Sequence, residues 1–340
     1  MNAPTKLFEV MPQTIAFKLD GRDVTAFEGE SILKAAERNG VDIPRLCYKD
    51  GLRADGNCRS CVVEVKGERV LAPSCCRNVT ADMEVSASSP RALKSQKMVL
   101  EMLLSDMPDT GYKWTDGDGD TEAAAPVGQH GELSEWTSRM DVTVRPELKA
   151  LRREQPKADV SHPAMAVNLD ACIQCNRCVR ACREEQVNDV IGYAMRGDHS
   201  EIVFDLNDPM GDSTCVACGE CVQACPTGAL MPKTQIGSQA VDKKVDSVCP
   251  FCGVGCLLTY NVKDNAIVSV DGRDGPANHS RLCVKGRFGF DYAHSPQRLT
   301  RPLIRKAGVA KDPQALDTLN RDSADWSAVF REATWEEALS

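Results

Sequence analysis

Cysteine is the residue type that dominates the chemistry open to this chain of 340 residues. All but one of its 17 cysteines fall into four sets of four. The sets are Cys47, Cys58, Cys61 and Cys75; Cys172, Cys175, Cys178 and Cys182; Cys215, Cys218, Cys221 and Cys225; and Cys249, Cys252, Cys256 and Cys283. Thiolates repeated at such short intervals, with a trailing fourth, are typical of iron–sulfur cluster sites. The spacing therefore predicts a protein that holds such clusters and passes electrons between them.

The second and third sets form an internal repeat. Each has the spacing C-x2-C-x2-C-x3-C, and Pro226 follows the last cysteine of the third set. In two-cluster ferredoxins the fourth cysteine of each run ligates the other cluster. The pattern therefore predicts two [4Fe–4S] clusters with crossed ligands. Their ligands would be Cys172, Cys175, Cys178 and Cys225 for one cluster, and Cys215, Cys218, Cys221 and Cys182 for the other.

Zinc is the competing reading of these two sets, because C-x2-C pairs also form tetrahedral structural zinc sites. Such sites usually need two pairs of cysteines, whereas each set here is a triplet with a trailing fourth. A disulfide framework accounts for the cysteines poorly, since a chain of this length can bury cores without covalent staples. We therefore favour iron–sulfur clusters.

The fourth set has the spacing C-x2-C-x3-C-x26-C, with Gly253 and Gly255 between its first three cysteines. A backbone that bends around an inorganic core favours glycine, and the set predicts a third [4Fe–4S] cluster. The stretches 248–256 and 281–287 resemble the N-terminal cluster domain of molybdenum- or tungsten-bis-pterin oxidoreductases, formate dehydrogenases above all. In that family the lysine two residues after the fourth cysteine lies between cluster and pterin. The resemblance implies this role for Lys285, and a solvated surface lysine is the alternative.

The first set, C-x10-C-x2-C-x13-C, differs from plant-type ferredoxins, whose first gap is four residues. The segment 56–65 resembles the [2Fe–2S] domain of the large iron–sulfur subunit of respiratory NADH dehydrogenase and of related formate dehydrogenases and hydrogenases. The resemblance implies one [2Fe–2S] cluster, on Cys47, Cys58, Cys61 and Cys75. Cys76 is then spare. We read it as a bystander thiol, because adjacent residues rarely both point at one metal, and ligand exchange with Cys75 is the alternative.

The segments around the first set predict a small β-grasp scaffold. Four short runs suggest two hairpins, 14–19 with 23–26 and 62–65 with 68–71. Asp20-Gly21 is a hairpin turn signal, and a helix is expected from the N-cap Ser31 to Asn39-Gly40. The cluster loop would run between these packed elements.

A second helix is expected at 93–104, with Leu93, Leu100 and Leu104 on one stripe, widened by Met98 and Met102. In NADH-dehydrogenase and hydrogenase subunits with this [2Fe–2S] domain, a histidine-ligated [4Fe–4S] motif follows that helix. Here Met107 stands where the histidine would fall and Gly111 where the first cysteine would. We therefore expect no cluster between Cys76 and Cys172. His130 and His162 lack cysteines at the required spacing, and we read both as structural.

Taken together, the segments predict an α+β, multidomain iron–sulfur protein with five parts. These are a [2Fe–2S] β-grasp domain at 1–92, a helical and acidic connector without a cluster at 93–160, a two-[4Fe–4S] ferredoxin-like domain at 161–240, a pterin-proximal [4Fe–4S] domain at 241–300, and the start of a pterin-binding catalytic domain at 301–340. The last part rests on resemblance to the same oxidoreductases. Residues for the pterin metal and the substrate would lie further along, so we expect a truncated chain or one half of a split enzyme.

The composition agrees with a cytoplasmic redox protein. The chain has 41 Lys and Arg against 49 Asp and Glu, a net charge of -8, which argues against a nucleic-acid partner. The N-terminus shows neither an apolar signal segment nor a twin-arginine motif, and no stretch approaches the length of a membrane span. We expect a cytoplasmic location, where thiols stay reduced and available to clusters.

The resemblance as a whole implies the N-terminal part of the alpha subunit of a cytosolic, NAD-dependent molybdenum or tungsten formate dehydrogenase. In that family a bis-pterin centre takes two electrons from formate, and clusters pass them singly to a flavin-bearing partner that reduces NAD. The expected cofactors are one [2Fe–2S] and three [4Fe–4S] clusters, with a molybdenum or tungsten bis-pterin only if the downstream domain is present. The expected partners are an FMN- and NAD-binding iron–sulfur subunit and, as a further candidate, a small [2Fe–2S] subunit.

Three alternatives stay open. An NADH-dehydrogenase large subunit shares the first cysteine set and a pterin-like domain, but normally carries the histidine-ligated cluster. An iron-only hydrogenase shares the first three sets, but would continue into a catalytic cysteine motif in place of C-x2-C-x3-C-x26-C. A stand-alone electron carrier is what the chain would be if nothing followed it.

Overall fold

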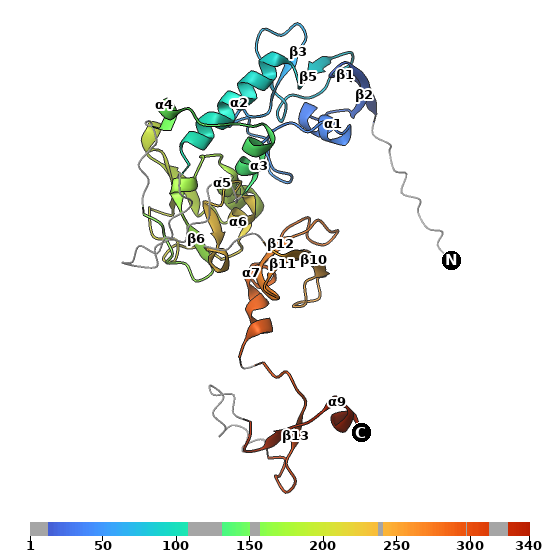
Figure 1. Cartoon of the computed structure of the whole chain (residues 1–340), viewed down its shortest axis with the longest axis vertical. Helices are drawn as coiled ribbons and strands as arrows, with labels where there is room; N and C mark the ends of the chain where they lie inside the picture. Colours follow the sequence, from blue (N-terminus) through green and yellow to red (C-terminus); the bar gives the residue numbers. More distant parts are fainter. Residues whose placement is uncertain (1–12, 108–130, 150–156, 237–240, 297, 313–325) are drawn as a thin grey trace, which may run out of the picture. The chain divides into compact units, whose positions relative to one another are not determined.

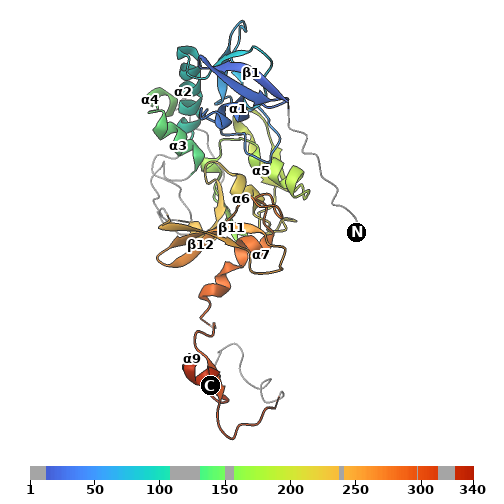
Figure 2. The same cartoon turned by 90° about the vertical axis from the view of Figure 1, so that its right-hand side faces the viewer.

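The computed structural model describes residues 13–107, 131–149, 157–236, 241–296, 298–312 and 326–340. The chain forms two compact units, Met1–Arg287 and Phe288–Ser340. The first unit contains all four cysteine sets, and Figures 1 and 2 show its elements in perpendicular views. Among the residues described, no helix is both long enough and apolar enough to cross a bilayer.

A five-stranded sheet supports the first cysteine set (Figure 1). Its strands are β1 (Thr14–Leu19), β2 (Arg22–Phe27), β3 (Val62–Val65), β4 (Ala72–Pro73) and β5 (Glu84–Ser86), in the order β2-β1-β5-β3-β4. β1 and β5 are parallel, and the other pairs are antiparallel. Helix α1 (Ile32–Arg38) packs Ile32 and Leu33 into the core of this sheet. The region is therefore the small sheet with a packed helix that the sequence predicted.

The local signals for the first hairpin and helix are confirmed. Asp20 and Gly21 both have positive φ angles, 49° and 77°, as a two-residue turn matched to twisted strands requires. The hydroxyl of Ser31 caps α1 by accepting a hydrogen bond from the amide of Lys34 at 3.3 Å. Gly40, at φ 74°, ends the helix.

The predicted strand at 68–71 is wrong. The strand that pairs with Val62 and Val63 is β4, at Ala72–Pro73. The end of β3 pairs instead with the remote strand β5, and the amide of Lys66 donates to the Glu84 carbonyl at 2.9 Å. Because β5 occupies that edge, the residues after the turn at Gly67 have no strand to pair with there.

Helix α2 (Pro90–Ser105) confirms the predicted helix but only part of its predicted face, at Leu100. Three residues of the expected stripe are exposed: Leu93, Met98 and Met102. The buried residues are Ala92, Gln96 and Leu100. The Gln96 amide donates to the carbonyls of Val62 at 2.8 Å and Ala87 at 3.4 Å. A glutamine that pairs with a neighbouring backbone can thus take a core position that an apolar pattern does not mark.

The rest of the first unit consists of short elements. Two helices lie within the predicted connector, α3 (Glu132–Arg139) and α4 (Pro146–Lys149). The elements around the second and third cysteine sets are β6 (Met165–Val167), η1 (Leu169–Ala171), α5 (Arg177–Arg180), η2 (Ala181–Glu185), β7 (Ile191–Ala194), η3 (Gly197–His199), β8 (Glu201–Phe204), α6 (Glu220–Ala224), β9 (Leu230–Pro232) and η4 (Lys233–Gln235). β6 pairs with β9, and β7 with β8, both antiparallel.

A three-stranded antiparallel sheet, β10 (Lys243–Val248), β11 (Leu257–Lys263) and β12 (Ala266–Gly272), accompanies the fourth set, and α7 (Val284–Phe288) follows its last cysteine (Figure 2). The described part of the second unit has η5 (Gly289–His294), the antiparallel pair β13 (Leu303–Arg305) and β14 (Phe330–Glu332), and α9 (Trp335–Leu339).

Candidate iron–sulfur sites

The structure brings the four cysteines of the first set together in the loops beside the sheet. Cys47, Cys61 and Cys75 are buried, with exposed fractions of 1%, 1% and 3%. The amide of Cys47 donates to the sulfur of Cys58 at 3.4 Å. Hydrogen bonds from Cys58 and Cys75 lower the pKa of the Cys47 thiol, and a hydrogen bond from Cys75 lowers the pKa of the Cys61 thiol. The four sulfurs thus form one connected group.

Cys76 lies at the edge of this group. It is exposed, and its sulfur lies 3.6 Å from that of Cys75. A Cβ on Gly56 would approach the Cys76 sulfur to 3.0 Å, so the loop that precedes Cys58 packs closely against this thiol. The spare cysteine is therefore next to the predicted cluster, on its solvent side.

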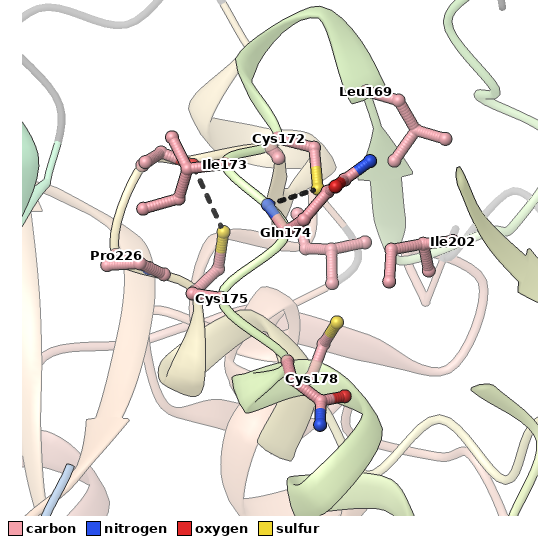
Figure 3. A pocket seen from close by; sticks show the side chains of 13 residues that line it. Leu169, Cys172, Ile173, Gln174, Cys175, Cys178, Ile202 and Pro226 are labelled. Carbon is pink, nitrogen blue, oxygen red and sulfur yellow. Dashed lines mark hydrogen bonds between the residues drawn. The ribbon is translucent and has the colours of Figure 1, made fainter. Parts of the chain in front are cut away.

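The second site is a pocket that contains cysteines from two different runs (Figure 3). Cys172, Cys175 and Cys178 line it together with Cys225. Figure 3 shows Cys172, Cys175 and Cys178 around a common space. The empty volume of the pocket is about 370 Å³, which includes some space open to solvent. The structure therefore groups the four residues that the ferredoxin pattern assigned to one cluster.

Burial and mutual repulsion govern the thiols of this pocket. Burial raises the pKa of Cys175 to about 12, and the nearby Cys225 thiolate contributes to this rise. The pKa of Cys178 is likewise raised by burial and then by Cys175 and Cys172. Four such thiols stay anionic only if a cation offsets them, and an iron–sulfur core is a cation of that kind.

The third site contains Cys215, Cys218 and Cys221 with Cys182 from the preceding run. Burial raises the pKa of Cys221, and the thiols of Cys218, Cys215 and Cys182 raise it further. Cys182 lies in η2, a single π-helical turn at the end of α5. Such turns are rare in proteins, and those that occur are often at functional sites. Here the turn places Cys182, the last cysteine of the second set, beside the cysteines of the third set.

The two repeats share a backbone conformation that the sequence did not reveal. The residues before and after the second cysteine have positive φ angles: Gln174 53°, Asn176 64°, Ala217 56° and Gly219 73°. In both repeats a backbone amide donates to the sulfur of the first cysteine at 3.4 Å. Hydrogen bonds of this kind favour the thiolate and tune a bound cluster. The repeat itself is the only sequence signal, since three of the four residues are not glycine.

The fourth site is the most exposed. Cys252 and Cys283 are exposed, and Cys249 and Cys256 are half-buried. Burial raises the pKa of Cys256, and the thiols of Cys249, Cys252 and Cys283 raise it further. Gly253 and Gly255 have φ angles of 78° and 84°, which confirms that this loop needs a left-handed backbone.

Lys285 is an exposed residue of α7, two positions after Cys283.

Met107 stands where the sequence comparison with related subunits places a histidine ligand. It is buried in an apolar cluster with Leu100, Leu133 and Trp136. Gly111 and His130 lie outside the described residues. His162 is buried, and its Nδ1 accepts hydrogen bonds from the amides of Ala164 and Met165, which supports a structural role.

The surroundings of these sites fit iron–sulfur clusters. The apolar cluster around Leu46, Leu133 and Met231 packs against Cys58 of the first set and against Cys172 and Cys225 of the second site. A dry, sulfur-rich pocket with amide donors is the environment that sets the potential of a cluster. In the part of the chain that the structure describes, no three His, Cys, Asp or Glu side chains are arranged to hold a single metal ion.

Three family models match the chain. They are a 2Fe-2S iron–sulfur cluster binding domain over residues 12–90, a 4Fe-4S dicluster domain over residues 171–229, and a molybdopterin oxidoreductase Fe4S4 domain over residues 242–295. Each match contains cysteines of the corresponding set or sets.

Curated relatives are similar over most of this chain. A subunit of the NADH-quinone oxidoreductase of Rhizobium meliloti is 32% identical over 87% of the chain and 33% of its own length. A putative formate dehydrogenase of Staphylococcus haemolyticus is 27% identical over 97% of the chain and 34% of its own length. One of Staphylococcus aureus strain USA300 has the same identity and chain coverage, over 36% of its own length. The chain thus spans about a third of the length of these relatives.

A solved structure shares the fold. The crystal structure of an NAD+-reducing [NiFe]-hydrogenase in the H2-reduced state contains a chain that aligns with a TM-score of 0.55 and 24% identity. The alignment covers 67% of this chain and 92% of that one.

Proposed function

We propose that this iron–sulfur electron-transfer module, which is related to putative formate dehydrogenases and to an NADH-quinone oxidoreductase subunit, takes part in formate oxidation. In this role the module carries electrons from a molybdenum or tungsten bis-pterin centre towards a cytoplasmic flavin- and NAD-binding subunit. The observation that carries the proposal is the molybdopterin oxidoreductase Fe4S4 match at residues 242–295, which contains Cys249, Cys252, Cys256 and Cys283.

The proposed ligands are the sixteen cysteines of the four sets, with Cys182 and Cys225 exchanged between the second and third. The grouping of Cys225 with Cys172, Cys175 and Cys178 around one pocket supports the exchange. When bound, the clusters supply reversible one-electron chemistry. The chain's own share is to hold them apart at fixed spacing, to exclude water with the apolar cluster around Leu133, and to donate backbone amides to the sulfurs.

Lys285 is the proposed contact between the last cluster and the pterin. Its position two residues after Cys283 and its exposure on α7 leave its ammonium group available to a downstream domain. The five-part domain layout predicted from the sequence, including a pterin-binding part from residue 301, belongs to the same proposal.

The second candidate is the large iron–sulfur subunit of an NADH dehydrogenase. The 32% identity to the Rhizobium meliloti NADH-quinone oxidoreductase subunit favours it. Met107 weighs against it, because this buried side chain stands where a histidine ligand is expected by resemblance. The formate dehydrogenase proposal therefore agrees better with the residue at position 107.

The two candidates differ in their electron source. In the full-length protein with its downstream domain, formate should bleach the cluster absorbance in anaerobic stopped-flow mixing. The 340-residue chain alone should accept electrons from dithionite and not from formate. Full-length protein that formate leaves oxidised, but that NADH reduces through its partner, would contradict the formate proposal and support the second candidate.

A further inference from the structure

Three arginine side chains are almost completely buried among the cysteine sites. Arg177, Arg180 and Arg287 have exposed fractions of 1%, 2% and 2%. Buried arginine is rare unless its charge is paired, so each guanidinium needs a partner. Arg177 and Arg287 have close carboxylate partners. Arg177 makes two contacts with Glu132, at 2.6 and 2.7 Å, and Arg287 pairs with the buried Glu220 at 2.6 Å.

Arg180 is different, because its close partners are uncharged. Its Nη2 donates to the carbonyl of Cys47 at 2.5 Å and lies 3.4 Å from the carbonyl of Cys175. Its Nη1 donates to the carbonyl of Arg53, and its Nε donates to the carbonyl of Asn176 at 3.2 Å. Among the described residues its paired carboxylate is Asp55, at 3.9 Å. Among the described residues, the carboxylate partner of this buried guanidinium is therefore more distant than the partners of Arg177 and Arg287, which lie at 2.6 Å.

The position of this charge is specific. Cys47 belongs to the first cysteine set and Cys175 to the second, and a single nitrogen of Arg180 reaches the backbone of both. Four thiolates around each cluster leave both sites with net negative charge. A buried cation between them interacts strongly, because the surrounding dielectric constant is low. The planar, rigid fork of arginine also fixes the two loops relative to each other, because its other nitrogens donate to the carbonyls of Arg53 and Asn176.

We propose that Arg180 is a positioning residue that joins the [2Fe–2S] site to the neighbouring [4Fe–4S] site and stabilises the reduced state of the clusters on both sides. The inference rests on the proposed assignment of Cys47 and Cys175 as cluster ligands. It adds a route for electrons, since the guanidinium links the two ligand backbones by hydrogen bonds. It also adds a determinant of potential, since reduction adds negative charge next to the cation.

The test compares three variants of the 340-residue chain, loaded with clusters under anaerobic conditions. Arg180→Met removes the charge and the fork, whereas Arg180→Lys keeps the charge and removes the fork. Arg183→Met is the matched control, because Arg183 lies three residues away, is 56% exposed and pairs with Asp189. The readouts are iron content, the midpoint potential of the [2Fe–2S] signal in an EPR redox titration, and the magnetic interaction between the two reduced clusters.

We expect Arg180→Met to make reduction of the [2Fe–2S] cluster about tenfold less favourable, which corresponds to about 59 mV for one electron. Arg180→Lys should keep a potential closer to that of the unchanged chain, but weaken the magnetic interaction. Arg183→Met should change neither. Full iron with an unchanged potential in Arg180→Met would overturn the proposal. If that variant loads poorly, an unchanged magnetic interaction in Arg180→Lys would overturn it equally.

The [2Fe–2S] EPR signal of the unchanged chain distinguishes a failure of this proposal from a failure of the ligand assignment on which it rests. An unchanged chain that shows no [2Fe–2S] signal would contradict the assignment of Cys47, and the proposal would fall with it. A normal signal that does not respond to Arg180 would contradict the proposal alone.

Discussion

Cys225 and Cys175 line the same pocket, although they belong to different cysteine runs. The relationship implies crossed ligation, and double variants can test it by the non-additivity of neighbouring sites. If both residues bind one cluster, then Cys225→Ser combined with Cys175→Ser should cost no more iron than either change alone, about four irons. Cys225→Ser combined with Cys218→Ser should cost about eight, because two clusters are lost.

Iron analysis and Mössbauer spectroscopy of the purified variants provide this measurement. Uncrossed ligation predicts the reverse result, with the pair Cys225 and Cys218 costing only one cluster. Cys76→Ser serves as the control and should leave the iron content unchanged.

Gln96 holds α2 to the sheet beneath the first cysteine set. Its amide donates to the carbonyls of Val62 and Ala87 from a position with 1% exposure. Gln96→Leu leaves both carbonyls without this donor and should lower the free energy of unfolding by about 1–3 kcal/mol. The measurement is the urea midpoint, followed by the visible circular dichroism of the [2Fe–2S] site. The neighbouring exposed Lys97, changed to Ala, should shift the midpoint little, and equal effects of the two changes would refute the role of Gln96.

Met107 is a core residue in this structure, with 6% exposure. Met107→Ala should therefore lower the free energy of unfolding by about 2–5 kcal/mol, the usual cost of truncating a buried methionine. The iron content should not change, because we predict no cluster between Cys76 and Cys172. Met102→Ala, on the exposed face of α2, is the matched control and should cost far less. Loss of iron in Met107→Ala, with the other variants fully loaded, would contradict this prediction.

Lys285 can be tested in the full-length protein. Lys285→Ala should slow the reduction of the clusters by formate about tenfold, the effect of about 1.4 kcal/mol on a barrier. The iron content and the reduction by dithionite should stay the same. Lys244→Ala, an exposed lysine of β10, is the control. Equal rates for both variants in pre-steady-state mixing would show that Lys285 is an ordinary surface lysine.

The sequence predicted the features that depend on local chemistry. The turn at Asp20-Gly21 and the cap at Ser31 are set by residues within a few positions, and both are as predicted. The clustering of the four cysteine sets also follows from ligand spacing. The crossed grouping of Cys225 with the second set followed from the internal repeat.

The features that the sequence did not predict depend on distant partners. The strand expected at 68–71 fails because β5 occupies the edge of β3. The predicted face of α2 was only partly right. Leu100 is buried as predicted, but Gln96 takes another core position because it donates to the carbonyl of Val62, a contact that no apolar pattern contains. The sequence analysis did not single out Arg180, and only the fold places it between the backbones of Cys47 and Cys175. The available signal was its position between Cys178 and Cys182, two predicted ligands.

The most direct test of the account is anaerobic iron and acid-labile sulfide analysis of the loaded 340-residue chain, with EPR of the dithionite-reduced state. One [2Fe–2S] and three [4Fe–4S] clusters predict about fourteen irons per chain, with both cluster types in the spectrum. A loaded chain that holds about four metal ions, all of them zinc, would contradict the central claim.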